Sequence, residues 1–163
     1  MKLVKEWMPY ILILLIVVLI RSFLFTPIKV QGSSMQDTLE GDEIMILWKI
    51  GDIQRYDIVV ADYMENGKKV DTLIKRVYGL PGETIKCEQG MIYVNDHKID
   101  DEYATNTTLD FETVTLGENE YFLMGDNRRV SKDSRVIGPI HRSEIQGTTD
   151  FVLWPFSKFG KVK

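Results

Sequence analysis

Cysteine and histidine are scarce in this chain. Its 163 residues include one cysteine, Cys87, and two histidines, His97 and His141. A single cysteine excludes a disulfide within the chain and any zinc site built from several cysteines. Two histidines are too few for most metal sites built from imidazole ligands. We therefore expect no metal and no cofactor.

The scarce residues also offer little catalytic chemistry of their own. Cys87 stands between Lys86 and Glu88, and no histidine is matched to it, so we do not expect a cysteine nucleophile. His97 follows the turn-like pair Asn95 and Asp96, and we expect both histidines at the surface. A hydrolase built from this sequence would need a base other than histidine.

The chain also lacks an excess of positive charge. Its formal net charge is −4, and its sequence pI is about 5.2. Nucleic-acid-binding domains are typically basic, so the composition gives no reason to expect a nucleic-acid partner. The length allows one domain plus a short appendage, and it is sufficient to bury a core.

A long apolar run lies near the N-terminus, at residues 7–25. As a helix, about nineteen residues would cover roughly 28 Å, which is close to the hydrocarbon thickness of a bilayer. Arg21 interrupts the run near its far end, where an arginine side chain can reach the interface. The run predicts a transmembrane anchor.

A cleaved secretory signal is the alternative, because Lys2 and Lys5 precede the run as they would in a signal peptide. No site with two small residues follows the run, since the next residues are Phe25, Thr26 and Pro27. We therefore favour a retained anchor. The two lysines predict a cytoplasmic N-terminus. Residues 1–25 would then form the cytoplasmic end and anchor, and residues 26–163 an extracytoplasmic β-rich domain in contact with the outer face of the lipid bilayer.

The rest of the chain is typical of an all-β protein. Short alternating or apolar runs separated by turn-forming residues predict strands at 43–48, 57–63, 72–78, 91–94, 120–124 and 147–153. No long stretch with helical periodicity follows the apolar run. We predict an antiparallel β-barrel or sandwich.

Ser34 and Lys75 are the candidates for catalysis. Ser34 lies a few residues beyond the apolar run, and a serine hydroxyl needs a base to become a nucleophile. In a strand, Lys75 shares a face with Leu73 and Val77, and an apolar setting lowers the pKa of an amine. The alternative is a lysine that protects an edge strand from aggregation. The pair predicts a membrane-tethered hydrolase that uses serine and lysine.

Six short segments carry a family pattern, at residues 32–39, 55–60, 75–82, 125–135, 138–140 and 154–155. In these segments the chain resembles a type I signal peptidase of the short bacterial kind. The most specific segment contains Gly125, Asp126, Asn127, Arg128, Ser131, Asp133, Ser134 and Arg135. The resemblance covers nearly the full length and implies a serine endopeptidase that removes signal peptides from secretory preproteins.

The resemblance also implies roles for individual residues. Ser34 would be the nucleophile that forms an acyl-enzyme, and Lys75 the general base. Ser131 would orient the lysine ammonium. The backbone N–H of Ser34 would donate to the oxyanion.

Two ion pairs are implied to hold the loop beside the site, Asp126 with Arg76 and Asp133 with Arg135. For Arg128, Arg129 and Lys132 we expect a solvated basic turn.

The substrate is implied to bind as an extended strand, with small residues at the first and third positions before the cleaved bond. The strand of Lys75 and the segment that ends at Gly32 are the implied edges for pairing. Met35 is either a wall of a shallow pocket or a core residue.

Two positions depart from the family pattern. Asp37 replaces a common proline, and Gly32 replaces a hydroxyl residue that some relatives use as an oxyanion donor.

Two other protein classes are alternatives. One is a specialised homologue that acts in the assembly of surface fibres, against which the joint presence of Ser34 and Lys75 argues. The other is a self-cleaving cytoplasmic repressor, against which the N-terminal run and the lack of a DNA-binding helix pair argue.

Overall fold

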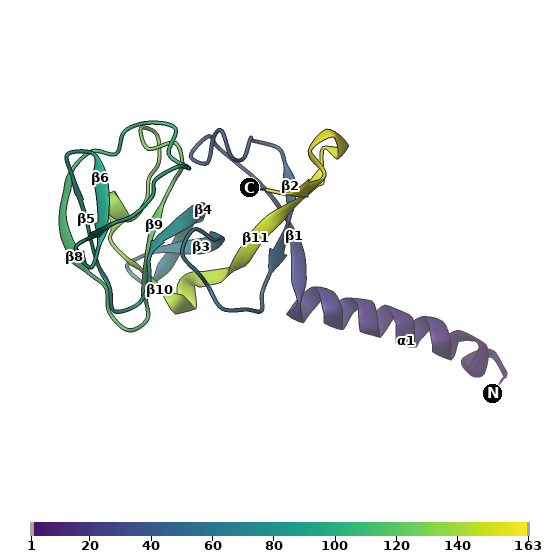
Figure 1. Cartoon of the computed structure of the whole chain (residues 1–163). Helices are drawn as coiled ribbons and strands as arrows, with labels where there is room; N and C mark the ends of the chain where they lie inside the picture. The colour runs from purple at the N-terminus through teal and green to yellow at the C-terminus, as the bar shows by residue number, and fades with distance from the viewer. Residues whose placement is uncertain (1, 163) are drawn as a thin grey trace.

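The computed structural model describes residues 2–162, and within the first helix it leaves the side chains of residues 2–5 and 20–23 undescribed. Helix α1 (Lys2–Phe23) extends away from a β domain that contains the rest of the chain (Figure 1). The domain has one large antiparallel sheet and one small antiparallel sheet. The catalytic candidates lie in the large sheet and its loops.

Helix α1 covers most of the predicted anchor but ends earlier. Phe25 starts strand β1 instead, where it pairs with Trp48. All described side chains of the helix, at residues 6–19, are exposed. Within the described part of the chain, no helix is both long enough and apolar enough to span a bilayer. The side chains of Lys2, Lys5 and Arg21, on which the predicted orientation depends, lie outside the described residues.

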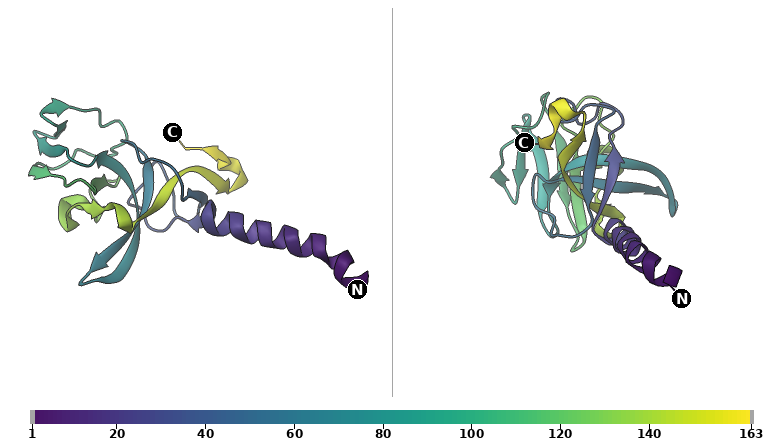
Figure 2. Two further views of the ribbon diagram at one scale, coloured as in Figure 1. Left: turned by 90° about the horizontal axis from the view of Figure 1, so that it is seen from below. Right: turned by 90° about the vertical axis from the view of Figure 1, so that its right-hand side faces the viewer.

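The large sheet contains the strands that carry the site. In spatial order it runs β1 (Phe25–Lys29), β2 (Ile44–Trp48), β11 (Ile145–Trp154), β3 (Ile58–Glu65), β4 (Lys68–Gly79), β9 (Glu120–Met124) and β10 (Ile140–His141), with β12 (Gly160–Lys161) paired to β11. The β3–β4 hairpin projects from the body of the domain (Figure 2).

The small sheet lies at the far end of the domain from α1 (Figure 1). Its spatial order is β7 (His97–Lys98), β6 (Met91–Val94), β5 (Thr84–Glu88) and β8 (Phe111–Thr115). The remaining helices are single turns: α2 (Ser134–Ile137), η1 (Arg142–Glu144) and η2 (Phe156–Lys158).

The prediction of an antiparallel β fold is confirmed, but the large sheet does not close into a barrel. The large sheet ends at β1 on one side and at β10 on the other, and these two strands do not pair. β10 is only two residues long, and β11 has irregular register against both of its long neighbours. All six predicted strands exist, as β2, β3, β4, β6, β9 and β11, whereas β1, β5, β7, β8, β10 and β12 were not predicted.

Strand β4 separates two parts of the core and has one partly free edge. Val77 packs with Val59 and Ala61 in one cluster, while Ile74 packs against a second cluster that contains Met35. This is the alternation expected of a strand. Residues 76–79 of β4 pair with β9, but residues 68–75 pair only with β3. The free edge therefore ends at Lys75.

Candidate functional site

Ser34 and Lys75 lie in contact at the end of this free edge. Ser34 is in the turn between β1 and β2, after Gly32, whose positive φ of +79° suits glycine. Lys75 Nζ lies 2.6 Å from Ser34 Oγ and donates to the carbonyl oxygen of Ile74 at 2.9 Å. Lys75 is 3 % exposed and Ser34 is half-buried. The structure thus brings together the two residues that the sequence selected.

The surroundings of Lys75 change its protonation. Burial lowers its pKa from 10.5 to about 8, because an ammonium loses hydration in the core. The nearby carboxylates of Asp133, Asp71 and Asp126 act in the opposite direction, but burial outweighs them. With a pKa of about 8, about one amine in ten is neutral at pH 7, compared with about one in three thousand for a free lysine. A neutral amine at this distance can accept the hydroxyl proton of Ser34.

A buried ion pair lies behind the Ser34–Lys75 contact. Arg76 donates to both carboxylate oxygens of Asp126, from Nε at 3.0 Å and from Nη2 at 2.7 Å. Both side chains are buried. Thr38 Oγ1 donates to the same carboxylate at 2.5 Å. Because Thr38 lies four residues after Ser34, this network ties the turn of Ser34 to the strand of Lys75. The sequence reasoning assigned no role to Thr38, although it stands in the matching segment.

The second implied ion pair is also present. Arg135 donates from Nε and Nη2 to the two oxygens of Asp133, each at 2.8 Å. Asp133 also accepts the backbone N–H of Gly125 at 2.9 Å. Burial alone would raise the pKa of Asp133, but these hydrogen bonds hold it below its ordinary value. The carboxylate therefore stays charged and fixes the loop that spans residues 125–135.

Glycine at position 125 allows this loop to approach Ser34 closely. A Cβ atom at Gly125 would lie 2.5 Å from the carbonyl oxygen of Ser34 and would collide with Ser131 Oγ. The backbone N–H of Asn127 donates to the same Ser34 carbonyl at 3.0 Å. The loop is thus positioned by the backbone of Ser34 as well as by its own ion pair.

Ser131 lies near this contact, but its hydroxyl does not bond to Lys75. Its Oγ is buried and makes no hydrogen bond of good geometry among the described residues, although it lies near enough to the Asp133 carboxylate to help lower the pKa of that group. The implied bond to the lysine ammonium is therefore not formed in this structure. The hydroxyl remains available to a group that enters or changes protonation nearby.

The prediction that this basic turn is exposed to solvent is wrong for Arg128 and correct for Arg129 and Lys132. Arg128 is 4 % exposed, and its guanidinium donates to both oxygens of Asp101, at 2.7 and 2.5 Å. It also donates to the carbonyl oxygen of Gly125 at 3.0 Å. Arg129 and Lys132 are exposed. Arg128 therefore joins the loop to the segment before β8, a contact between distant residues that no local pattern signals.

The two candidates for substrate binding differ in position. Gly32 lies in the wall of an open groove, whereas Met35 is 2 % exposed and packs with Val30, Leu39 and Met45. Of the two alternatives for Met35, its position favours core packing. Asp37, which departs from the family pattern, is exposed.

The groove has a volume of about 1030 Å³ and contains the Ser34–Lys75 contact. One wall is the segment from β1 to Ser34, and the other is the free edge of β4 from Lys69 to Lys75. Val60, Val130, Lys132 and Gln146 complete the lining. A groove bordered by an unpaired strand can accept an extended peptide as an additional strand.

Comparisons with known proteins agree on one family. The family described as "Signal peptidase, peptidase S26" matches residues 4–154. Signal peptidase I of Bacillus licheniformis is 36% identical, and the alignment covers 96% of this chain and 91% of that protein. Signal peptidase I S of Bacillus subtilis strain 168 is 38% identical, with 98% and 94% covered. Signal peptidase I of Streptococcus pneumoniae is 34% identical, with 96% and 95% covered.

A solved structure gives the same result for the fold. A signal peptidase I from Enterococcus faecalis superposes with a TM-score of 0.53 at 29% sequence identity, covering 61% of this chain and 97% of that one. The family match extends over most of the sequence, and the relatives exceed 30% identity over nearly all of it. The chain therefore belongs to the signal peptidase family of S26 peptidases and is a serine endopeptidase.

Proposed function

We propose that this protein removes signal peptides from secretory preproteins with a catalytic dyad of Ser34 and Lys75. The observation that carries the proposal is the 2.6 Å contact between a serine hydroxyl and a buried amine with a pKa of about 8. The membership of the chain in the signal peptidase family supports the choice of substrate.

The reaction proceeds in two steps. In the first, Ser34 Oγ bonds to the carbonyl carbon of the scissile peptide while neutral Lys75 takes the hydroxyl proton. The tetrahedral intermediate then collapses, the C–N bond breaks, and the lysine ammonium returns the proton to the leaving amine. In the second step a water loses its proton to Lys75 and attacks the ester. The C–O bond to Ser34 then breaks, the lysine ammonium returns the proton to Ser34 Oγ, and the signal peptide leaves as a carboxylic acid.

The negative oxygen of the intermediate needs donors in the groove. The backbone N–H of Ser34 makes no hydrogen bond within the described residues, so it can donate to this oxygen. Gly32 has no hydroxyl to add. The oxyanion site thus depends on the backbone, and the ion pairs that hold this backbone contribute to catalysis through geometry.

Ser131 acts on the charged form of the base. Its buried Oγ lies near the Asp133 carboxylate and makes no hydrogen bond of good geometry within the described residues while Lys75 contacts Ser34. Once Lys75 has taken the proton, a hydroxyl next to the loop can accept a hydrogen bond from the ammonium and orient it for return of the proton. Arg76 with Asp126, and Asp133 with Arg135, keep the loop in place.

The substrate lies in the groove as an extended strand. Its backbone pairs with the free edge of β4 and with the segment that ends at Gly32, and its small side chains occupy the first and third positions before the cleaved bond. Support comes from the unpaired edge and from the glycine in the facing wall.

Helix α1 forms the core of a membrane anchor. Its described side chains are almost all apolar and all exposed, and a helix with apolar residues on every side requires an apolar environment. We place residues 1–25 in the cytoplasm and membrane and residues 26–163 on the outer face. The groove would then lie near the membrane surface from which preproteins emerge.

The alternative of a homologue that assembles surface fibres has less support. Such a protein has no need of a serine hydroxyl and a neutral amine in contact within a groove, and the relatives are named as signal peptidases.

Ser34→Ala should abolish cleavage of a preprotein whose signal ends in a small-x-small site, whereas Ser33→Ala should keep most of the activity. The adjacent serine lines the same groove, but the hydroxyl that lies against Lys75 Nζ is that of Ser34. The assay is the gel shift from preprotein to mature protein. Loss of activity from Ser33→Ala alone would overturn the assignment of the nucleophile.

Lys75→Arg should be as inactive as Lys75→Ala, because a guanidinium does not deprotonate and cannot serve as the base. In the unchanged protein, kcat/KM should rise with pH through an apparent pKa of about 8, since only the neutral amine is active. A pH series of initial rates measures this. Substantial turnover by Lys75→Arg would refute a lysine base.

Thr38→Val should lower kcat about tenfold and leave KM unchanged, because the variant loses the bond to Asp126 that positions the turn of Ser34. Thr38→Ser keeps the hydroxyl and should restore most of kcat. Steady-state kinetics of both variants provide the comparison. Equal kcat values for Thr38→Val and the unchanged protein would show that the bond does not position the nucleophile.

The β domain should be digested when protease is added to intact spheroplasts, and washing with carbonate should not release the protein from membranes. Both results follow from an anchor with its N-terminus in the cytoplasm. Immunoblotting of the fractions distinguishes the orientations, since a reversed chain would protect the β domain until the membrane is disrupted.

A further inference from the structure

The groove continues well beyond Ser34 and Lys75, along the projecting β3–β4 hairpin. Its lining follows β4 back from Lys75 through Leu73 and Asp71 to Lys69. Residues 68–75 have no strand on their outer edge. A substrate strand long enough to reach this part would place residues here that lie several positions before the cleaved bond.

Two of the four charged residues that line the groove besides Lys75 are already paired. Lys29 lies 2.8 Å from Asp42, and Lys69 lies 2.6 Å from Asp62. Apart from Lys75, the charged lining residues without an ion-pair partner within the described residues are Lys132 and Asp71. These two side chains can therefore respond to a charge on the substrate.

One contact with an aromatic ring holds Lys132 over the hairpin. Its Nζ lies 4.3 Å from the centre of the Tyr63 ring, a cation–π contact that fixes the ammonium on the face of β3. Tyr63 is directly opposite Asp71 in the sheet register. Because Asp71 lies four residues before Lys75, this position is about 13 Å along the strand from the catalytic lysine.

The carboxylate of Asp71 is the opposing group at this place. It accepts the backbone N–H of Thr72 at 2.8 Å, which satisfies part of its hydrogen-bonding capacity. The ammonium of Lys132 has three N–H donors, and none of them has a hydrogen bond to a protein acceptor within the described residues. Lys132 is thus the stronger candidate for contact with a substrate side chain.

We propose that Lys132 is a specificity-determining residue that favours a carboxylate side chain four to six residues before the cleaved bond. The assignment rests on the proposed function, which places the upstream part of the substrate along β4. It adds a charge preference to the requirement for small residues near the cleaved bond.

The test uses the full chain in a neutral detergent and two peptides that share alanine at the first and third upstream positions. The peptides differ only in glutamate or lysine at the fifth upstream position. The unchanged protein should cleave the glutamate peptide with a kcat/KM about two to five times higher, the range expected for an exposed pair of charges. About 0.5 M salt should remove most of this preference.

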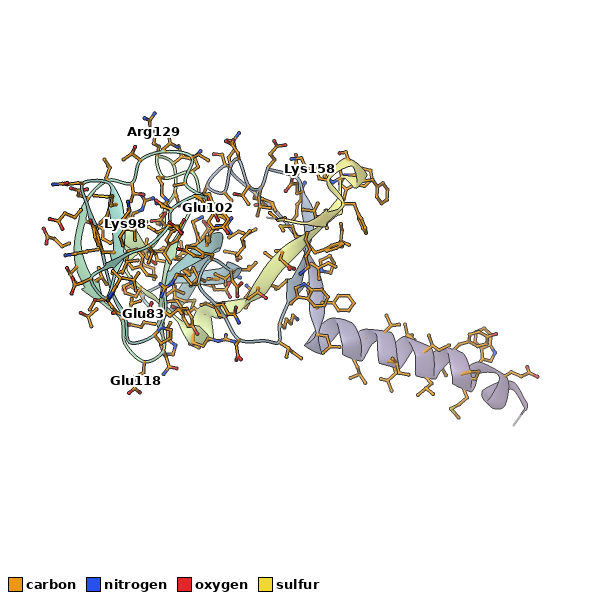
Figure 3. All side chains as sticks on the ribbon, viewed as in Figure 1. Glu83, Lys98, Glu102, Glu118, Arg129 and Lys158 are labelled. Atoms are coloured by element: carbon orange, nitrogen blue, oxygen red, sulfur yellow. The ribbon has the colours of Figure 1, made fainter. Side chains whose placement is uncertain are left out.

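Lys132→Glu should invert the preference, and Lys132→Met should abolish it. Arg129→Glu is the matched control, because it makes the same change in net charge three residues earlier. Arg129 is exposed and projects outward from the domain, and it does not line the groove (Figure 3). The control should keep the preference for glutamate.

Two results would overturn the assignment while leaving the peptidase intact: an unchanged preference in Lys132→Glu, or an equal shift in Arg129→Glu. Failure of the unchanged protein to cleave either peptide, or any preprotein with a small-x-small site, would instead refute the proposed function, and the assignment with it. Scanning the charged residue from the fourth to the sixth position should locate the maximum of the preference.

Discussion

The buried ion pair between Arg76 and Asp126 is the interaction on which the site depends. It joins strand β4 to the loop after β9, and through Thr38 it joins both to the turn of Ser34. Removing one partner of such a pair leaves an uncompensated charge in the core, at a cost of about 3–5 kcal/mol. The contact between Ser34 and Lys75 is formed by residues 41 positions apart, so it requires a connection of this kind.

The same pair protects the protonation state of the base. Lys75 has a low pKa because it is buried, yet the carboxylates of Asp126 and Asp133 lie close enough to raise it. Each of these carboxylates holds an arginine, Arg76 or Arg135, in a two-point contact. The positive guanidinium offsets the field of its carboxylate at Lys75. The arginines therefore have two effects, since they fix the loop and limit the influence of the acids on the amine.

Strand-level features could be predicted because they depend on local sequence. The apolar run at residues 72–78 correctly predicted a strand there, and the other five predicted strands were also found from short apolar runs between turns. Closure of the sheet could not be predicted in this way, since it depends on whether two strands distant in sequence pair. The short strands β7, β10 and β12 have two residues each and carry no periodic signal.

At the site, too, the family motifs implied which residues pair, but not what surrounds each side chain. The resemblance implied both ion pairs correctly, because a motif encodes the pairing of residues that lie apart in the chain. It did not give the surroundings of each side chain. The hydroxyl of Ser131 lies near the Asp133 carboxylate and makes no hydrogen bond to Lys75, and Met35 packs in the core. Those outcomes depend on backbone positions that no residue pattern specifies.

Three cations of one loop illustrate how position decides the role of a charge. Arg128, Arg129 and Lys132 lie within five residues of one another, and the sequence alone gives them the same interpretation. Arg128 reaches Asp101 and becomes buried, because a bidentate carboxylate contact and the carbonyl of Gly125 compensate its lost hydration. Arg129 stays in solvent. Lys132 lies over the Tyr63 ring at the groove and makes no ion pair within the described residues. The charge of Arg128 stabilises the loop, whereas that of Lys132 is accessible to a substrate. Two cations four residues apart in one loop therefore have different roles.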